Sequence, residues 1–234
     1  MINNRTPTSI EIPHGKKILV LALGSWEQHG PHLPLDTDSV IVSRVVDDAF
    51  NHPDINTEDF LRAPLLPITA SDEHDGFVGG LSTGTDALSA SVVSICRSAA
   101  SWSAGVLLVN GHGGNYDGLQ MITSALDYEH ITHSVWTLPS YAGGDMHAGH
   151  TETSLMLHIA PHSVRTDLIS SVQASAATID DLRHVGVKGV SPSGVLGDPS
   201  TATARHGETV LHLYVHSLVQ RLQSCAAEWL HSPT

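Results

Sequence analysis

A short segment near the N-terminus combines carboxylate and imidazole side chains at a spacing suited to metal binding. It runs from Glu27 to His32 with the sequence EQHGPH, and Asp38 follows it. Glu27 and His29 stand two residues apart, so in an extended chain both side chains leave on the same side. Asp38 can return to the same place after a proline-rich turn. Such a set suits zinc, iron(II) or manganese, and one carboxylate can bridge two ions. The alternative is a polar loop that follows a strand.

A second segment surrounds one histidine with glycines. It has the sequence NGHGGN and spans Asn110 to Asn115. Glycine permits unusual backbone dihedrals and close approach of the backbone to a ligand, so His112 is a candidate metal ligand. Asn115 is a candidate substrate contact. The alternative is a plain strand-to-helix turn in which Asn115 caps the helix.

Two further groups of ionisable residues complete the set of candidates. His147 and Glu152 lie in the segment 145–154, at the start of a predicted helix, where Glu152 would also suit ordinary N-terminal charge stabilisation. Glu73 and His74 precede Gly76 and are candidate substrate contacts, with a solvated loop as the alternative. The three ligand-like clusters around Glu27, His112 and His147 favour a common site more strongly than any one of them alone.

Two continuous apolar runs predict the strands that would position these residues. Ile18–Leu23 and Val106–Val109 have the composition of strands buried on both faces of a parallel sheet. Each run is followed at once by one of the candidate segments. Because α/β sheets bind ligands beyond the carboxyl ends of their strands, we expect the candidates to meet there.

Helical periodicity separates the strands and predicts the fold class. Amphipathic or small-residue helices are expected over residues 39–50, 86–102, 115–128, 152–159 and 208–230. Ser39 is expected to cap the first of them, and Gly186–Gly207 to form an ordered loop. The alternation predicts an α/β fold, a three-layer α/β/α sandwich with a mostly parallel central sheet, built as a single domain over residues 1–234.

The amino-acid composition limits the classes of partner that the protein can have. The formal net charge of −13 disfavours nucleic acid and anionic membrane surfaces as partners. The two cysteines, Cys96 and Cys225, suggest core thiols rather than a disulfide framework. The absence of a long apolar run and of a signal-peptide pattern leads us to expect a cytoplasmic protein without a membrane partner. The 17 histidines exceed the 11 lysines and arginines, which draws attention to metal binding.

In order and spacing, the EQHGPH block with Asp38, the NGHGGN block and the block around His147 resemble the creatininase family. The resemblance covers most of the chain. It implies a creatininase-like α/β fold, a homo-oligomer, and two divalent metal ions per chain that serve the hydrolysis of cyclic or linear amides. By position, Glu27 and His112 would bind one ion, His29 would bind the other, and Asp38 would bridge both.

One position departs from the family pattern. Creatininase carries a glutamate two residues after the histidine that aligns with His112, where it acts as a ligand and proton carrier, and this chain has Gly114 there. Our hypothesis is that Glu152 supplies the missing carboxylate and that His147 is a proton shuttle or substrate contact. The same departure argues against creatinine as the substrate.

Shorter strings resemble one branch of the family. These are Glu73–Phe77, Leu81–Thr85 and Ser193–Pro199, which are similar to the peptidases of mycofactocin biosynthesis. The resemblance implies cleavage of a modified precursor peptide that releases its C-terminal Val-Tyr-derived fragment, with water activated by the metal pair. Two alternatives stay open: a cyclic amide or formamide hydrolase of the same family, such as a formamidopyrimidine deformylase, and a non-catalytic metal-binding protein.

Overall fold

The computed structural model describes residues 7–172 and 179–231. Its centre is a four-stranded sheet in the order β2-β1-β3-β4, and every neighbouring pair is parallel. The strands are β1 (Ile18–Leu23), β2 (Phe60–Arg62), β3 (Gly105–Asn110) and β4 (His133–Thr137). Strands β1 and β3 pair along their whole length, from Ile18 opposite Gly105 to Leu23 opposite Asn110. Their carboxyl ends are therefore level with each other.

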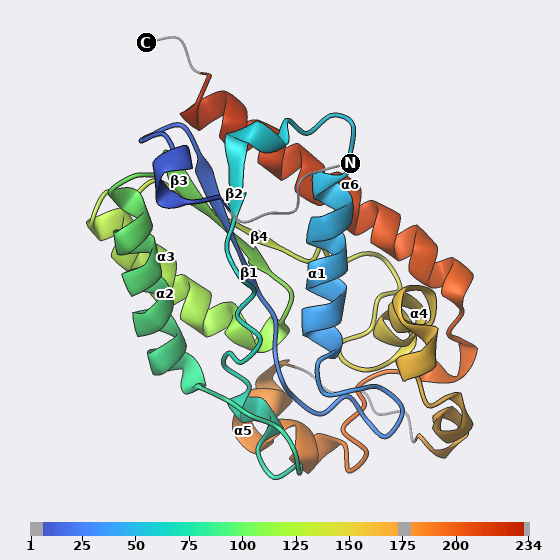
Figure 1. The fold of residues 1–234 in the computed structure, drawn as a ribbon. Helices are drawn as coiled ribbons and strands as arrows, with labels where there is room; N and C mark the ends of the chain where they lie inside the picture. The colour runs from blue at the N-terminus through green and yellow to red at the C-terminus, as the bar shows by residue number, and fades with distance from the viewer. Residues whose placement is uncertain (1–6, 173–178, 232–234) are drawn as a thin grey trace.

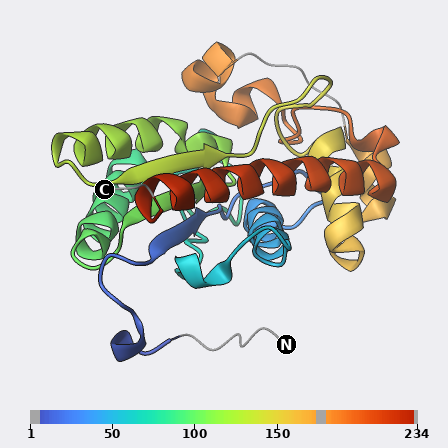
Figure 2. The ribbon, with the colours of Figure 1, turned by 90° about the horizontal axis from the view of Figure 1, so that it is seen from above.

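Helices cover both faces of this sheet (Figure 1). Helices α2 (Gly84–Ala100) and α3 (Tyr116–Tyr128) lie on one face. Helices α1 (Thr37–Phe50), α4 (His150–Ile159) and α6 (Ala204–Trp229) pack on the other. Seen from above, the long helix α6 crosses the molecule beside strand β4 (Figure 2). The expected three-layer α/β/α sandwich is confirmed.

The alternation of side chains along β1 explains the two covered faces. Ile18, Val20 and Ala22 pack with α1, α4 and α6, whereas Leu19, Leu21 and Leu23 pack with α2 and α3. All six residues of the strand are buried. Burial of apolar side chains on both faces is the main favourable contribution to folding here, at about 25 cal/mol for each Å² removed from water.

The predicted elements are present, with three corrections. Helix α1 begins at Thr37, and Ser39 does not cap it, because the Ser39 hydroxyl instead donates to the Ser25 carbonyl. The expected loop over 186–207 is partly wrong, since α5 (Ile179–Val190) extends into it through a kink at Gly186. Strands β2 and β4 were not predicted; β2 has only three residues, and β4 starts with the polar pair His133-Ser134.

The remaining expectations concern the cysteines and membrane insertion. Cys96 and Cys225 are both free and buried, as expected of core thiols. Among the described residues, none of the helices combines the length and the apolar character that a bilayer crossing requires. The carboxyl ends of the strands point toward α4 and α5 in Figure 1.

Candidate metal centre

Candidate residues from five separate segments meet at the carboxyl ends of β1 and β3. Four overlapping groups have ligand atoms within 4.8 Å of one another: Glu27, Asp38 and His112; His29, Asp38 and Glu152; Glu27, His29 and His147; and Glu27, Glu73 and His74. The chain after β1 provides Glu27 and His29, and the first turn of α1 provides Asp38. The turn after β3 provides His112. Parallel strands of matched register thus bring together residues that are far apart in sequence.

Asp38 lies between two histidines and faces each with a different oxygen. Its Oδ1 is 3.2 Å from Nε2 of His29, and its Oδ2 is 2.9 Å from Nδ1 of His112. The Ser25 hydroxyl donates to Oδ2 at 2.8 Å and fixes the carboxylate. Asp38 is 2% exposed. This is the arrangement that a carboxylate bridging two cations requires.

Backbone carbonyls set the orientation of three imidazole rings. Nδ1 of His29 is 3.2 Å from the Glu27 carbonyl, Nε2 of His112 is 2.9 Å from the Ala70 carbonyl, and Nε2 of His147 is 2.8 Å from the Gln28 carbonyl. A carbonyl only accepts, so each of these nitrogens carries a hydrogen. When such a ring is neutral, as a metal ligand must be, its other nitrogen directs a lone pair into the cluster. A carbonyl behind a histidine ligand is the usual outer support of protein metal sites.

Glu27 is a buried carboxylate whose oxygens lack hydrogen bonds. Its exposure is 0%, and neither Oε1 nor Oε2 has a hydrogen-bond partner. Burial raises the pKa of Glu27 to about 8, against the opposing effect of His112. Oε2 nevertheless lies 3.1 Å from Nε2 of His112. Because Nε2 of His112 carries a hydrogen, His112 would bind an ion through Nδ1, and the ligand atoms that Glu27, Asp38 and His112 offer lie within 4.8 Å of one another, as a shared cation requires.

The charge balance of the cluster also suits bound cations. Within the described ranges, every ion-pair partner of Glu27, Asp38, Glu73 and Glu152 is a histidine. Burial disfavours a charged His29, yet the carboxylates of Asp38, Glu152 and Glu27 together outweigh it and raise the pKa of His29 to about 10. In the metal-free protein, protons on the imidazoles therefore balance the negative charge of the carboxylates. Divalent ions would replace those protons, and the residues present fit a metal centre.

Glu152 closes the cluster on the side of His29. Its Oε2 accepts a hydrogen bond from the Ala148 N–H at 2.5 Å and lies 3.8 Å from Nε2 of His29. Burial raises the pKa of Glu152 to about 7. Ala148 adopts a left-handed backbone conformation, with φ of 53°, which is uncommon for a residue with a side chain and typical of functional sites.

Glu73 lies against Gly114, the position where the family pattern has a glutamate. A Cβ atom on Gly114 would be 1.9 Å from Oε1 of Glu73, so the Glu73 carboxylate occupies the space of a side chain at position 114. Oε1 is also 3.4 Å from Nε2 of His112. The sequence suggested Glu73 only as a substrate contact, and the sole signal for this position was the missing side chain at Gly114.

Helix α5 holds the segment that carries Glu73. The Lys188 ammonium donates to the Gly76 carbonyl and lies 5.4 Å from the centre of the Phe77 ring. The Gly186 backbone approaches the Glu73 carbonyl so closely that an added Cβ would be 3.2 Å from it. Sequence reasoning did not connect these segments, because residues more than a hundred positions apart meet here.

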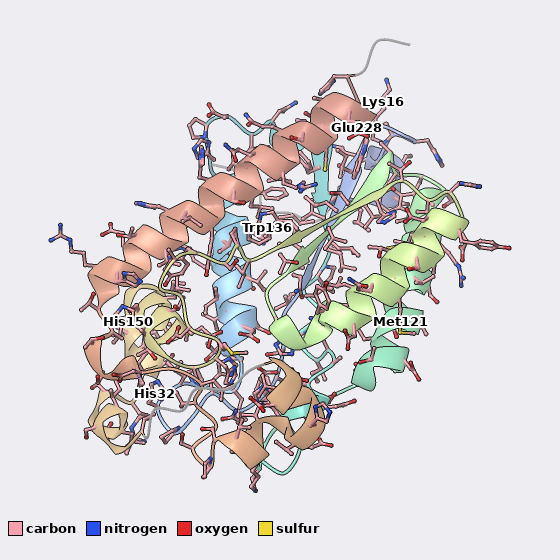
Figure 3. All side chains as sticks on the ribbon, turned by 180° about the vertical axis from the view of Figure 1, so that it is seen from behind. Lys16, His32, Met121, Trp136, His150 and Glu228 are labelled. Carbon is pink, nitrogen blue, oxygen red and sulfur yellow. The ribbon has the colours of Figure 1, made fainter. Side chains whose placement is uncertain are left out.

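Two other residues of the motifs support the backbone. Asn115 is fully buried; its Oδ1 accepts from the Ala70 N–H at 3.2 Å and its Nδ2 donates to Asn110 at 2.9 Å. It belongs to none of the four groups described above. Nε2 of His32 is 2.8 Å from the Thr153 hydroxyl. Figure 3 shows His32 at the same end of the molecule as His150, far from Lys16 and Glu228.

Comparison with known proteins agrees with this architecture. The family model for creatininase, described as creatinine amidohydrolase, matches residues 5–222. The mycofactocin precursor peptide peptidase of Mycobacterium tuberculosis is 41% identical over 97% of this chain and 91% of its own length. A formylaminopyrimidine nucleotide deformylase of Methanobrevibacter ruminantium is 33% identical over 56% of this chain and 53% of its own length. A solved mutant creatininase of Zn-Zn type has a TM-score of 0.67 and 22% identity, with 92% of both chains covered. The chain belongs to the creatininase family.

Proposed function

We propose that this protein is a binuclear metal-dependent peptidase that cleaves a modified mycofactocin precursor peptide and releases its C-terminal Val-Tyr-derived fragment. The observation that carries the proposal is the 41% identity, over nearly the full length of both chains, to a mycofactocin precursor peptide peptidase. The metal-binding geometry at the carboxyl end of the sheet supports the hydrolytic chemistry.

The proposed ligand sets follow from the shared position of Asp38. Glu27, Asp38 and His112 would hold one ion, and His29, Asp38 and Glu152 would hold the other. When bound, zinc, iron(II) or manganese ions polarise a carbonyl and make water nucleophilic near neutral pH. The related creatininase structure of Zn-Zn type favours zinc as the first metal to test.

His147 is the proposed proton carrier. Its Nε2 donates to the Gln28 carbonyl, which leaves the Nδ1 lone pair 3.7 Å from Oε1 of Glu27. Burial, helped by the nearby His29, holds the pKa of His147 well below its usual range, so the ring is neutral at rest. As a neutral base, Nδ1 would accept the proton that the attacking water loses and pass it to the leaving amine. Glu152 is the second group proposed for this transfer.

Deformylation of a pyrimidine nucleotide is the second candidate function. Similarity to the archaeal deformylase favours it, but this similarity extends over 56% of the chain, against 97% for the peptidase. Metal storage is disfavoured because His130, His158 and His212, among others, lie outside the four groups. Storage proteins repeat their ligands along the chain, whereas the candidate ligands among the described residues concentrate in one mixed site.

The proposal extends to the whole chain and its assembly. We propose that residues 1–234 form one domain and that the protein acts as a homo-oligomer. Light scattering coupled to size exclusion would measure the mass in solution. A mass of 24.8 kDa, that of one chain, would refute the oligomer.

The test is a cleavage assay with two substrates. Purified protein would be incubated separately with the modified precursor peptide and with the formylated pyrimidine nucleotide, and products would be identified by mass spectrometry. We expect release of the C-terminal peptide fragment, loss of cleavage after chelation, and recovery with zinc, iron(II) or manganese. Deformylation without peptide cleavage would replace the proposal by the second candidate. Cleavage that persists after complete metal removal would refute the metal dependence.

A further inference from the structure

The side-chain amide of Gln28 is fixed at both ends by the backbone. Its Oε1 accepts from the Gly30 N–H at 2.9 Å, and its Nε2 donates to the Gly194 carbonyl at 3.0 Å. An N–H group only donates and a carbonyl only accepts, so these two contacts independently assign the oxygen and the nitrogen of the amide. Gln28 is 6% exposed. Rotation of the amide by 180° would break both bonds inside the protein.

This orientation determines which nitrogen of His74 carries a hydrogen. Nε2 of Gln28 is 2.8 Å from Nδ1 of His74. Because the amide nitrogen donates, Nδ1 must accept and holds no hydrogen. The hydrogen of the neutral ring is then on Nε2, which lies 3.2 Å from Oε1 of Glu27. His74 therefore directs an N–H, and not a lone pair, toward the Glu27 carboxylate.

Gly194 is required for this arrangement. Its φ is +82°, and a Cβ atom there would lie only 1.8 Å from Oε1 of Gln28. The neighbouring segment is held in place, because the Ser191 hydroxyl donates to the Val195 carbonyl at 2.8 Å. Gly194 belongs to the string 193–199, which contributes no residue to the four candidate metal-binding groups. Its contact with Gln28 links that string to the metal centre.

We propose that Gln28 and His74 form a positioning pair for Glu27, in which His74 presents its Nε2–H to the side of Oε1 and is not a metal ligand. Oε2 is thereby left for the cation on the side of His112. His29 and His147 have the opposite arrangement, because each donates to a backbone carbonyl and directs its lone pair inward. His112 donates to the Ala70 carbonyl and directs its Nδ1 lone pair toward Asp38. The buried and otherwise unpartnered oxygens of Glu27 are the independent sign that a ligand belongs here. The inference rests on the proposed metal centre but not on the identity of the peptide.

Nitrogen-15 NMR tests the assignment on the intact protein. Histidine-labelled protein would be recorded metal-free and with zinc, and the His74 signals would be identified by their loss in His74→Gln. We expect Nε2 of His74 to be protonated and Nδ1 unprotonated in both states, while one nitrogen each of His29 and His112 shifts on zinc addition. An unprotonated Nε2 of His74 that shifts with zinc would overturn the proposal and make His74 a ligand.

Zinc affinity, measured by competition with a chromophoric chelator, tests the positioning role. Loss of an outer-shell partner typically costs about 10–100-fold in metal affinity, and we expect this loss for His74→Ala. His74→Gln keeps an N–H near the position of Nε2 and should restore most of the affinity. His133→Ala, which removes a half-buried histidine from β4, is the matched control and should bind zinc normally. Equal affinity in His74→Ala and the unchanged protein would overturn the positioning role, as would an equal loss in His74→Gln.

The two tests separate this inference from the proposed function. If His74→Ala does not fold, the NMR assignment on the unchanged protein still decides. Zinc binding with the expected dependence on His74 but no peptide cleavage would refute the peptidase alone. Peptide cleavage with a metal-ligating His74 would refute the inference alone.

Discussion

The carboxylate of Glu73 fills the space above Gly114. A Cβ on Gly114 would lie 1.9 Å from Oε1 of Glu73 and 2.4 Å from Nε2 of His112. The carboxylate at this point of the site thus comes from the 3-10 turn Asp72–His74 and not from the turn after β3. Glu152, our hypothesis from the sequence, belongs instead to the group of His29 and Asp38.

The first prediction concerns Glu73, whose carboxylate lies against Gly114. Glu73→Gln removes a charge beside His112 but keeps the shape. Because the Glu73 carboxylate lies where the family pattern has a proton-carrying glutamate, we expect kcat to fall by about 10²-fold or more, the usual effect of losing a proton-transferring group. Asp75→Asn removes the same charge from an exposed position on the same segment and should leave kcat unchanged. Steady-state peptide cleavage measures both. A normal kcat in Glu73→Gln would exclude a catalytic contribution of this carboxylate.

The second prediction concerns His147. His147→Gln removes the Nδ1 lone pair that faces Glu27, so kcat should fall by about 10²–10⁴-fold. Metal content should stay at the level of the unchanged protein, because His147 lies outside the two proposed ligand sets. Metal analysis and turnover on the same samples measure both quantities. Loss of metal in step with activity would instead assign His147 as a ligand.

The third prediction concerns the pH dependence of the metal-free protein. The folded state raises the pKa of His29 from 6.5 to about 10, mainly through Asp38 acting against burial, and burial raises the pKa of Glu27 from 4.5 to about 8. Between pH 6.5 and about 10 the folded state thus binds more protons than the unfolded state, so its stability falls as pH rises.

Thermal unfolding of chelated protein across this range measures the effect. We expect the Tm of the metal-free protein to decrease steadily with pH. The Tm of the zinc-loaded protein should decrease less with pH, because bound ions take the place of the protons and bind more tightly as pH rises. A Tm of the metal-free protein that increases over the same range would contradict the electrostatic description of the cluster.

Much of the fold followed from local patterns. The apolar runs at Ile18–Leu23 and Val106–Val109 predicted β1 and β3 because strands buried on both faces need no polar alternation. Strand β2 was not predicted because three residues are too few to show a pattern. The kink of α5 at Gly186 depends on its contact with the Glu73 segment, which lies far away in sequence.

The candidate site was predictable in its parts but not in its connections. The sequence predicted Glu27, His29, Asp38 and His112 as ligands, and the structure brings them together. It did not indicate that Glu73 lies on Gly114 or that Gln28 fixes His74. These relationships are set by side-chain rotamers and loop packing, for which residue spacing carries no signal.

The central claim is that Asp38 joins two cations, and metal stoichiometry in Asp38→Asn tests it most directly. Asp48→Asn, the same substitution at another position of α1, is the control. We predict two divalent ions per chain in the unchanged and control proteins, and fewer than one in Asp38→Asn, since both proposed ligand sets lose a charged member. Two ions per chain retained in Asp38→Asn, or an unchanged protein that cleaves the peptide with no metal bound, would contradict the account.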